Sequence, residues 1–223
     1  MAIFVDSGKI EEIQKFMQMG LLRGVTTNPT ILLNAGVSGG MKEIKKRAIE
    51  IARIIHPYPL SIEVTTNDKE EMIKQAQDFA QWADNINVKI AIHGPNGELS
   101  GLEVTHILEN KYKIPVNVTA MMSAQQCLLA AMAGATYVSL FGGRINNMGY
   151  NCIEEIKKIR KLIDDFNFKA KIIVGSTREI LNIVEWLAAG AHIVTATPEL
   201  IKGMIIHPYS KETVKKFLND AVI

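Results

Sequence analysis

Lys89 lies in the middle of an apolar, β-branched segment, where a charged side chain is uncommon. Over residues 86–92, isoleucine and valine alternate with Asn87, Lys89 and Ala91, a pattern typical of a β-strand whose successive side chains point to opposite faces. If both faces are covered, keeping the ammonium charged is costly, and a neutral amine can attack a ketone carbonyl to form an imine. The alternative is a lysine near a strand end whose charged head reaches water.

Other polar residues that can do chemistry follow segments of the same apolar, β-branched kind. They include acids, amides, hydroxyls and two arginines, with one phenylalanine among them: Asp6, Thr27, Asn28, Glu63, Asn117, Thr119, Ser139, Phe141, Arg144, Ser176 and Arg178. A helix N-terminus beside Arg178 would make an anion site, to which Arg144 could add a second guanidinium.

Several of these residues also have ordinary structural explanations. Asn28 before Pro29 is typical of a turn that opens a helix, and Asp6-Ser7 is typical of a helix N-cap. Ser176-Thr177 could cap the helix that follows them. Glu63, taken alone as an acid at a strand end, is equally consistent with a functional and a structural role.

The segments that position these residues alternate between strand-like and helical patterns. Strands are predicted at residues 3–5, 25–27, 60–64, 86–92, 116–119, 137–140, 171–174 and 193–196. Helical periodicity is found at residues 10–17, 41–55, 69–82, 102–110, 124–132, 153–166, 178–188 and 198–205, with a last helix near 211–221. About eight strand–helix units indicate a parallel sheet closed on itself, the (β/α)₈ or TIM barrel.

An open doubly wound sheet is the alternative fold, but it would be expected to carry a GxGxxG turn after its first strand, and that motif is absent. Since no linker or low-complexity tract divides the chain, residues 1–223 are predicted to form a single α/β barrel domain with an extra C-terminal helix. In such barrels the active site lies at the carboxyl ends of the strands, so the polar residues above should meet at one mouth.

Composition excludes several other classes of function. The 25 basic and 23 acidic residues give a formal net charge of +2, which predicts no nucleic-acid partner and no membrane surface. Cys127 and Cys152 have no metal-type spacing, and the five histidines share no ligand pattern, so no metal and no cofactor is expected. His93, just beyond Lys89, is the histidine nearest the expected mouth. The N-terminus lacks a signal-peptide pattern, which predicts a cytoplasmic location.

Taken in order, these residues resemble the transaldolase family, specifically its short subgroup that includes fructose-6-phosphate aldolase and sulfofructose transaldolase. The resemblance covers essentially the whole chain and is carried by these motifs: Phe4-Val5-Asp6, Gly24-Val25-Thr26-Thr27-Asn28-Pro29-Thr30, Val88-Lys89-Ile90, Asn117-Val118-Thr119, Ala133-Gly134-Ala135-Thr136-Tyr137-Val138-Ser139 and Gly143-Arg144.

The resemblance implies a role for each matching residue. Lys89 would be the Schiff-base lysine, and Asp6 would assist proton transfer at the C4 hydroxyl. Glu63 and Thr119 would hold the water that carries protons during imine formation. The binding residues would be Asn28, Asn117 and Ser139 for the dihydroxyacetone hydroxyls, and Arg144, Ser176 and Arg178 for the terminal anion.

Two positions indicate a transferase rather than an aldolase that releases free dihydroxyacetone. The aldolase members carry glutamine where this chain has Glu63 and tyrosine where it has Phe141. The tyrosine helps water to protonate the enamine, whereas a phenyl ring leaves the enamine for an aldehyde acceptor such as glyceraldehyde 3-phosphate.

Departures from the family pattern gather near the distal anion and the mouth. Leu140, Gly142 and Asn146-Asn147 replace a proline, a valine and an acidic pair, and residues 91–93 replace Pro-Leu-Thr. These changes suggest a donor with an altered anionic head, of which 6-deoxy-6-sulfofructose is a type known in the family, and fructose 6-phosphate stays the other candidate donor. The rival hypotheses are a true aldolase and a non-catalytic barrel that binds sugar phosphates. The resemblance also implies a homo-oligomer, a pentamer or decamer, in which the C-terminal helix reaches a neighbour.

Overall fold

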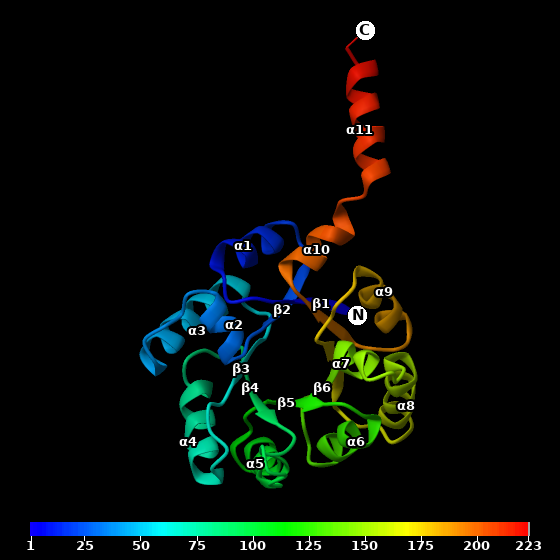
Figure 1. Cartoon of the computed structure of the whole chain (residues 1–223). Helices are drawn as coiled ribbons and strands as arrows, with labels where there is room; N and C mark the ends of the chain where they lie inside the picture. Colours follow the sequence, from blue (N-terminus) through cyan, green and yellow to red (C-terminus); the bar gives the residue numbers. More distant parts are fainter. Residues whose placement is uncertain (223) are drawn as a thin grey trace.

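A closed barrel of eight parallel strands, arranged in chain order, forms the centre of the molecule (Figure 1). The computed structural model describes residues 1–222. The strands are β1 (Ala2–Asp6), β2 (Leu22–Thr26), β3 (Leu60–Glu63), β4 (Ile86–Ala91), β5 (Val116–Met121), β6 (Tyr137–Phe141), β7 (Lys171–Gly175) and β8 (Ile193–Ala196). The predicted (β/α)₈ architecture is confirmed.

Helices surround the barrel on its outer side (Figure 1). They are α1 (Ile10–Gln18), α2 (Pro29–Asn34), α3 (Met41–Ile55), α4 (Lys69–Ala80), α5 (Ser100–Ile107), a π-helical turn η1 (Leu108–Tyr112), α6 (Ala124–Met132), α7 (Gly142–Asn147), α8 (Cys152–Asp165), α9 (Ile180–Ala188), α10 (Pro198–Ile205) and α11 (Pro208–Asp220). Among the described residues no helix is both long enough and apolar enough to cross a membrane.

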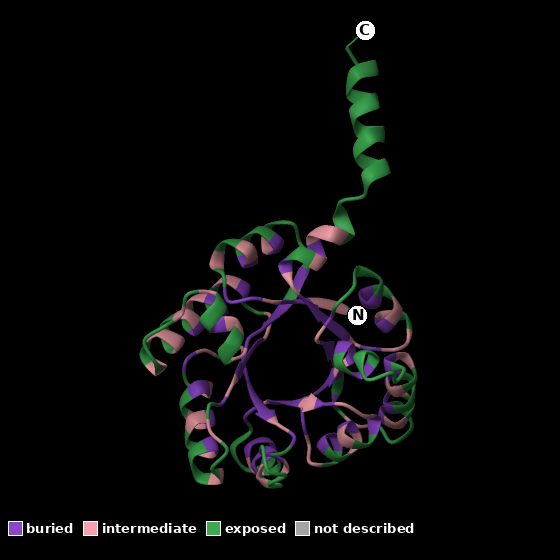
Figure 2. Ribbon diagram, in the orientation of Figure 1, coloured by how far each residue is buried: buried purple, intermediate pink, exposed green. Residues whose placement is uncertain are grey.

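The main core lies between the sheet and the surrounding helices. The strands are buried almost throughout, as the purple ring in Figure 2 shows. Apolar stripes on the helices pack against it, for example Ala48, Ile51, Ala52 and Ile55 on α3. Because both faces of the sheet are covered, the strands read as nearly continuous apolar runs in the sequence.

The inside of the barrel is divided into an apolar lower part and a polar upper part. Phe4, Tyr137, Ile173 and Ile193 form a small separate apolar cluster. The next inward-facing position on each of these strands, two residues later, is polar or small: Asp6, Ser139, Gly175 and Thr195. Since side chains alternate between the faces of a strand, the cluster closes the barrel from below and leaves its carboxyl end to polar groups.

Gly24 on β2 makes room for this plug. A Cβ at Gly24 would lie 2.5 Å from the Phe4 ring, a distance that no real contact allows. The glycine therefore lets the phenyl ring cross the barrel interior, and its role is close packing.

Two expectations about helix starts are wrong. Asp6-Ser7 does not cap α1, because the N-cap position is Lys9 and the Ser7 hydroxyl donates to Glu12 instead. Ser176-Thr177 does not cap α9, which begins three residues later with Glu179 at its N-cap. Asp6 instead accepts from the Thr26 hydroxyl, and the Thr177 hydroxyl donates to the Thr195 carbonyl.

The last helix, α11, projects away from the barrel (Figure 1), and every one of its residues is exposed (Figure 2). It begins at Pro208, three residues before the predicted start, with His207 at the N-cap. A proline fits the first helical position because its missing N–H would be unpaired there anyway.

Candidate active site at the carboxyl end of the barrel

A cavity of about 260 Å³ opens at the carboxyl ends of the strands. It is lined by residues from seven of the eight strands or the loops that follow them, namely Asp6, Thr26, Asn28, Thr30, Ile31, Lys89, Asn117, Thr119, Ser139, Phe141, Arg144, Ile173, Gly175, Ser176, Arg178 and Thr195. Ten of the twelve predicted site residues therefore line one cavity, with Thr27 and Glu63 outside its lining, and Ile173 of the apolar cluster contributes to it.

Strand register brings the central groups of this site together. Glu63 on β3 pairs with Lys89 on β4, and Lys89 pairs with Asn117 on β5. Paired residues of neighbouring strands point to the same face. Three chemically different side chains, a carboxylate, an amine and an amide, thus lie side by side inside the barrel.

Lys89 is buried, with only 6% of its surface exposed. Its Nζ donates a hydrogen bond to the Thr27 carbonyl at 3.0 Å and lies 3.3 Å from Glu63 Oε2. The alternative explanation, a lysine that reaches bulk water, is therefore wrong. The amine has a carboxylate close enough to accept a proton from it.

Thr27 contributes to this arrangement through its backbone. Its side chain is buried and donates to the Ser61 carbonyl at 2.9 Å, so the Thr27 hydroxyl is already engaged with β3. The Thr27 carbonyl is the group that meets Lys89. Thr27 therefore helps to hold the Lys89 amine in place through its backbone carbonyl.

Asp6 sits at the end of β1, across the cavity from β5. Its Oδ1 accepts a hydrogen bond from the Thr26 hydroxyl at 2.7 Å. Removal from bulk water raises the pKa of this carboxyl above its ordinary value, while Lys89 and the Thr26 hydrogen bond act in the opposite direction and Glu63 adds to the rise. A cavity-lining carboxyl whose pKa is perturbed by burial and by a nearby lysine is a candidate for proton exchange with a ligand.

Asn117 is held in place by two hydroxyl groups. Ser139 donates to Asn117 Oδ1 at 2.6 Å, and Asn117 Nδ2 donates to the Ser61 hydroxyl at 3.1 Å. These contacts run across β3, β5 and β6 and determine which end of the amide faces which neighbour. Asn117 keeps one N–H with which to meet a ligand.

The Thr119 hydroxyl has no hydrogen-bond partner among the described residues, although it is buried. A buried hydroxyl without a partner costs free energy, so a ligand or water molecule in the cavity is its natural partner. Directly after it, Ala120 has a φ of 60° and the β5–β6 register shifts. This bulge turns Met121 outward into the core while Thr119 stays directed inward.

Asn28 combines the two roles that the sequence left open. Its Oδ1 accepts from the Ile31 amide at 2.8 Å and caps α2. Asn28 also lines the cavity, and its Nδ2 group remains able to donate to a ligand hydroxyl. The cap fixes the amide orientation that such a contact needs.

Arg144 and Arg178 stand at the open rim of the cavity, where both are exposed. The Arg144 guanidinium lies over the Phe141 ring, 5.1 Å from its centre, a distance typical of a cation–π contact. Gly143 lets the two arginine segments approach: a Cβ there would lie 1.9 Å from the Ser176 carbonyl oxygen and 2.8 Å from Arg178 Cγ. The rim is consequently positive at one end of the site.

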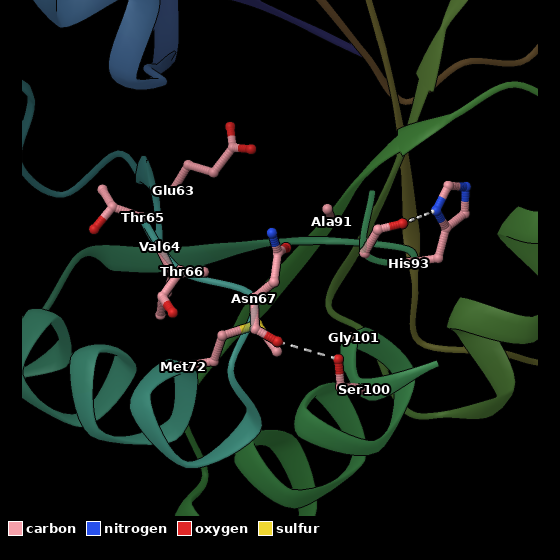
Figure 3. A pocket seen from close by; sticks show the side chains of 11 residues that line it. Glu63, Val64, Thr65, Thr66, Asn67, Met72, Ala91, His93, Ser100 and Gly101 are labelled. Atoms are coloured by element: carbon pink, nitrogen blue, oxygen red, sulfur yellow. Dashed lines mark hydrogen bonds between the residues drawn. The ribbon is translucent and has the colours of Figure 1, made fainter. Parts of the chain in front are cut away.

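A second cavity of about 220 Å³ is lined by residues at the carboxyl ends of β3 and β4 and by the segments that follow them. Glu63 lines it, and Figure 3 shows its carboxylate extending away from Thr66, Asn67 and Ser100. His93 lies at this second cavity, where its Nδ1 bonds to the Gly94 carbonyl at 2.8 Å. His93 is therefore outside the lysine cavity. Glu63 lines the second cavity, and its Oε2 lies 3.3 Å from Lys89 Nζ.

Thr26, Gly175 and Thr195 line the cavity but are missing from the residues predicted to form it. Extending the inward alternation of each strand to β2, β7 and β8 would have found them. Cys127 and Cys152 are buried free thiols away from the site, and burial raises the pKa of both, which leaves them unreactive.

Fold and site together define a (β/α)₈-barrel protein with a buried lysine, two carboxyls and a cationic rim at the carboxyl end of the sheet. The chain belongs to the family described as transaldolase/fructose-6-phosphate aldolase, whose model matches residues 3–222. It is accordingly an enzyme of this family.

Two relatives agree with this family assignment, and a solved structure shares the fold. The chain is 37% identical over 220 residues to a probable transaldolase from Carboxydothermus hydrogenoformans, covering 99% of this chain and 97% of that one. It is also 37% identical to a probable transaldolase from Bartonella tribocorum, covering 99% and 96%. A thiamine phosphate pyrophosphorylase from Pyrococcus furiosus superposes with a TM-score of 0.62 at 13% identity, covering 88% and 85%, which shows the shared barrel fold alone.

Proposed function

We propose that the protein is a Schiff-base transaldolase, which moves a dihydroxyacetone unit from a ketohexose with an anionic C6 group to an aldehyde acceptor such as glyceraldehyde 3-phosphate. The observation that carries this proposal is the buried Lys89 amine, 3.3 Å from Glu63 in a cavity that also holds Asp6. A nucleophile beside a proton acceptor, with a second acid–base group opposite, is what imine chemistry requires.

Imine formation begins with transfer of a proton from Lys89 to Glu63. The neutral amine attacks the C2 ketone, and the carbinolamine loses water to give the iminium. Glu63 returns a proton to the departing hydroxyl through a water molecule for which the unpartnered Thr119 hydroxyl is the natural binding group. All groups for this exchange belong to the chain, so we propose no cofactor and no metal.

Carbon–carbon cleavage then uses Asp6. Its carboxylate accepts the C4 hydroxyl proton, the C3–C4 bond breaks, the aldehyde leaves, and the electron pair of that bond passes to the iminium to form an enamine. Asn28, Asn117 and Ser139 hold the hydroxyls of the remaining three-carbon unit. The enamine then adds to the acceptor aldehyde through the reverse steps.

Transfer rather than release of dihydroxyacetone is supported by Phe141. This side chain lines the cavity with a phenyl ring, which has no hydroxyl with which to direct a proton to the enamine. A true fructose-6-phosphate aldolase is the second candidate function, because Glu63 lies 3.3 Å from Lys89 and also lines the second cavity, a place for the water that would protonate the enamine. Measuring free dihydroxyacetone with the acceptor omitted separates the two.

The anionic group of the donor is proposed to bind Arg144, Ser176 and Arg178. Guanidinium groups pair with either phosphate or sulfonate oxygens, so the rim supports both fructose 6-phosphate and 6-deoxy-6-sulfofructose as donors. Kinetics with each donor test this point. A strong preference for fructose 6-phosphate would remove the sulfonate hypothesis.

Reductive trapping tests the central proposal. Borohydride added with donor should increase the intact mass of the protein by the reduced adduct, and peptide mapping should place it on Lys89. Lys89→Met should show neither adduct nor turnover. A wild-type protein that binds donor without any adduct would favour the third hypothesis, a non-catalytic sugar-phosphate-binding barrel.

We also propose that the protein is a homo-oligomer, as a pentamer or decamer. The exposed helix α11 carries Val214, Phe217 and Leu218, each more than half exposed, and an apolar surface of this kind usually contacts a partner. Sedimentation equilibrium of the full chain and of a chain ending before Pro208 tests this proposal.

A further inference from the structure

Three oxygen-bearing side chains from β1, β2 and β8 form a continuous chain of hydrogen bonds at the edge of the site. The Thr195 and Thr26 hydroxyls lie 2.6 Å apart, and the Thr26 hydroxyl donates to Asp6 Oδ1 at 2.7 Å. Both threonines are buried, at 7% and 3% exposure, and both line the cavity that holds Lys89.

The donor and acceptor in each of these hydrogen bonds follow from the number of protons that a hydroxyl carries. A hydroxyl has one hydrogen to donate, and Thr26 gives its hydrogen to Asp6. The contact with Thr195 must then use a lone pair of Thr26, so Thr195 is the donor. An ionised Asp6 thus stands at the accepting end of a two-hydroxyl chain.

The fold holds the outer member of this chain in place. The Thr195 carbonyl accepts a hydrogen bond from the Thr177 hydroxyl at 2.8 Å, which ties β8 to the segment after β7. On β7, a Cβ at Gly175 would lie 3.0 Å from Thr195 Cγ2, so the glycine leaves the space that this side chain occupies. Strand register places Thr26 opposite Asp6.

We propose that Thr26 and Thr195 are positioning residues that keep the Asp6 carboxylate oriented, and ready to accept the proton of the donor's C4 hydroxyl. The proposal rests on the function proposed above and deepens it. Neither threonine is required to touch the reacting atoms, because each acts through Asp6.

The charges around Asp6 explain why this support matters. Its position away from bulk water and the nearby Glu63 raise its pKa, while Lys89 and the Thr26 hydrogen bond lower it. Arg144 and Arg178 line the same cavity. On the other side of Asp6, a separate cavity is lined by the charged residues Lys9, Glu12 and Glu199. Since the positive charge on the Lys89 nitrogen is lost in the neutral amine and again when the iminium becomes an enamine, the Thr26 hydrogen bond is the stabilising contact that stays constant.

The test compares Thr26→Val and Thr195→Val with Thr26→Ser and Thr195→Ser, which keep the hydroxyl. For Thr26→Val we expect kcat for donor cleavage to fall about tenfold at neutral pH, with KM nearly unchanged. The acid limb of the kcat/KM profile should move to higher pH, because the carboxylate loses a donor. Thr195→Val should change both quantities in the same direction by less, and both serine variants should recover most of the activity.

Trapping with borohydride and donor, together with thermal melting, accompanies each variant. Unchanged adduct formation with slowed cleavage would support the proposal. A raised KM with an unmoved pH profile would overturn it, since the threonines would then be ordinary substrate contacts. If Thr26→Val does not fold, the comparison of Thr195→Val with Thr195→Ser tests the proposal. Absence of any adduct on the wild-type protein would instead overturn the proposed function, and this inference with it.

Discussion

Replacing Lys89 by methionine should remove activity and should also lower the free energy of unfolding, because Glu63 loses its ion-pair partner. Methionine has a similar length and no charge, so Glu63, whose side chain is 24% exposed, loses the ammonium at 3.3 Å. Removing one partner of a fully buried pair costs about 3–5 kcal/mol. Because Glu63 reaches the second cavity and its solvent, we expect a smaller loss, about 2 kcal/mol, or a fall in Tm of about 4–8 °C.

The double variant Lys89→Met/Glu63→Gln provides the control for this estimate. It removes both charges, so most of the lost stability should return, and urea unfolding of the wild type, the two single variants and the double variant gives the coupling energy. Turnover and borohydride trapping measured in parallel should be absent in both variants that lack the lysine. Retained turnover in Lys89→Met, or a double variant no more stable than that single one, would refute the reasoning.

Three further predictions concern the acceptor step, the anionic rim and the barrel plug. Phe141→Tyr should increase free dihydroxyacetone released without acceptor, measured by coupled reduction, and an unchanged release rate would count against the role of the phenyl ring. Arg144→Ala should raise KM for a phosphorylated donor about 10–100-fold through loss of a charged hydrogen bond, while KM for an uncharged ketose should change little; equal effects on both donors would contradict an anion site. Gly24→Ala should lower the free energy of unfolding by about 1–3 kcal/mol because its Cβ meets the Phe4 ring, and a urea midpoint at the wild-type value would show that the ring moves aside easily.

Local patterns allowed much of the fold to be predicted. The helices at residues 41–55, 124–132 and 198–205 and the strand at 193–196 end where the structure has them. The region after β4 was harder: a single helix was expected at 102–110, but α5 passes into the π-helical turn η1. There the buried Glu109 carboxylate accepts from the Val116 and Thr136 amides and pairs with Lys169, contacts that a local pattern does not contain.

Local side-chain patterns were enough to predict the alternation of strands and helices, and with it the end of the barrel at which Lys89, Asp6 and the arginines would gather. Periodicity of side chains is a local property, so it can be read without the tertiary structure. Which groups touch was decided only by the register between strands that are distant in sequence. That register sets Glu63 beside Lys89, joins Thr195 to Thr26 across 169 residues, and leaves the Thr119 hydroxyl without a partner within residues 1–222. Pairing energies and close packing act between segments that no local pattern relates.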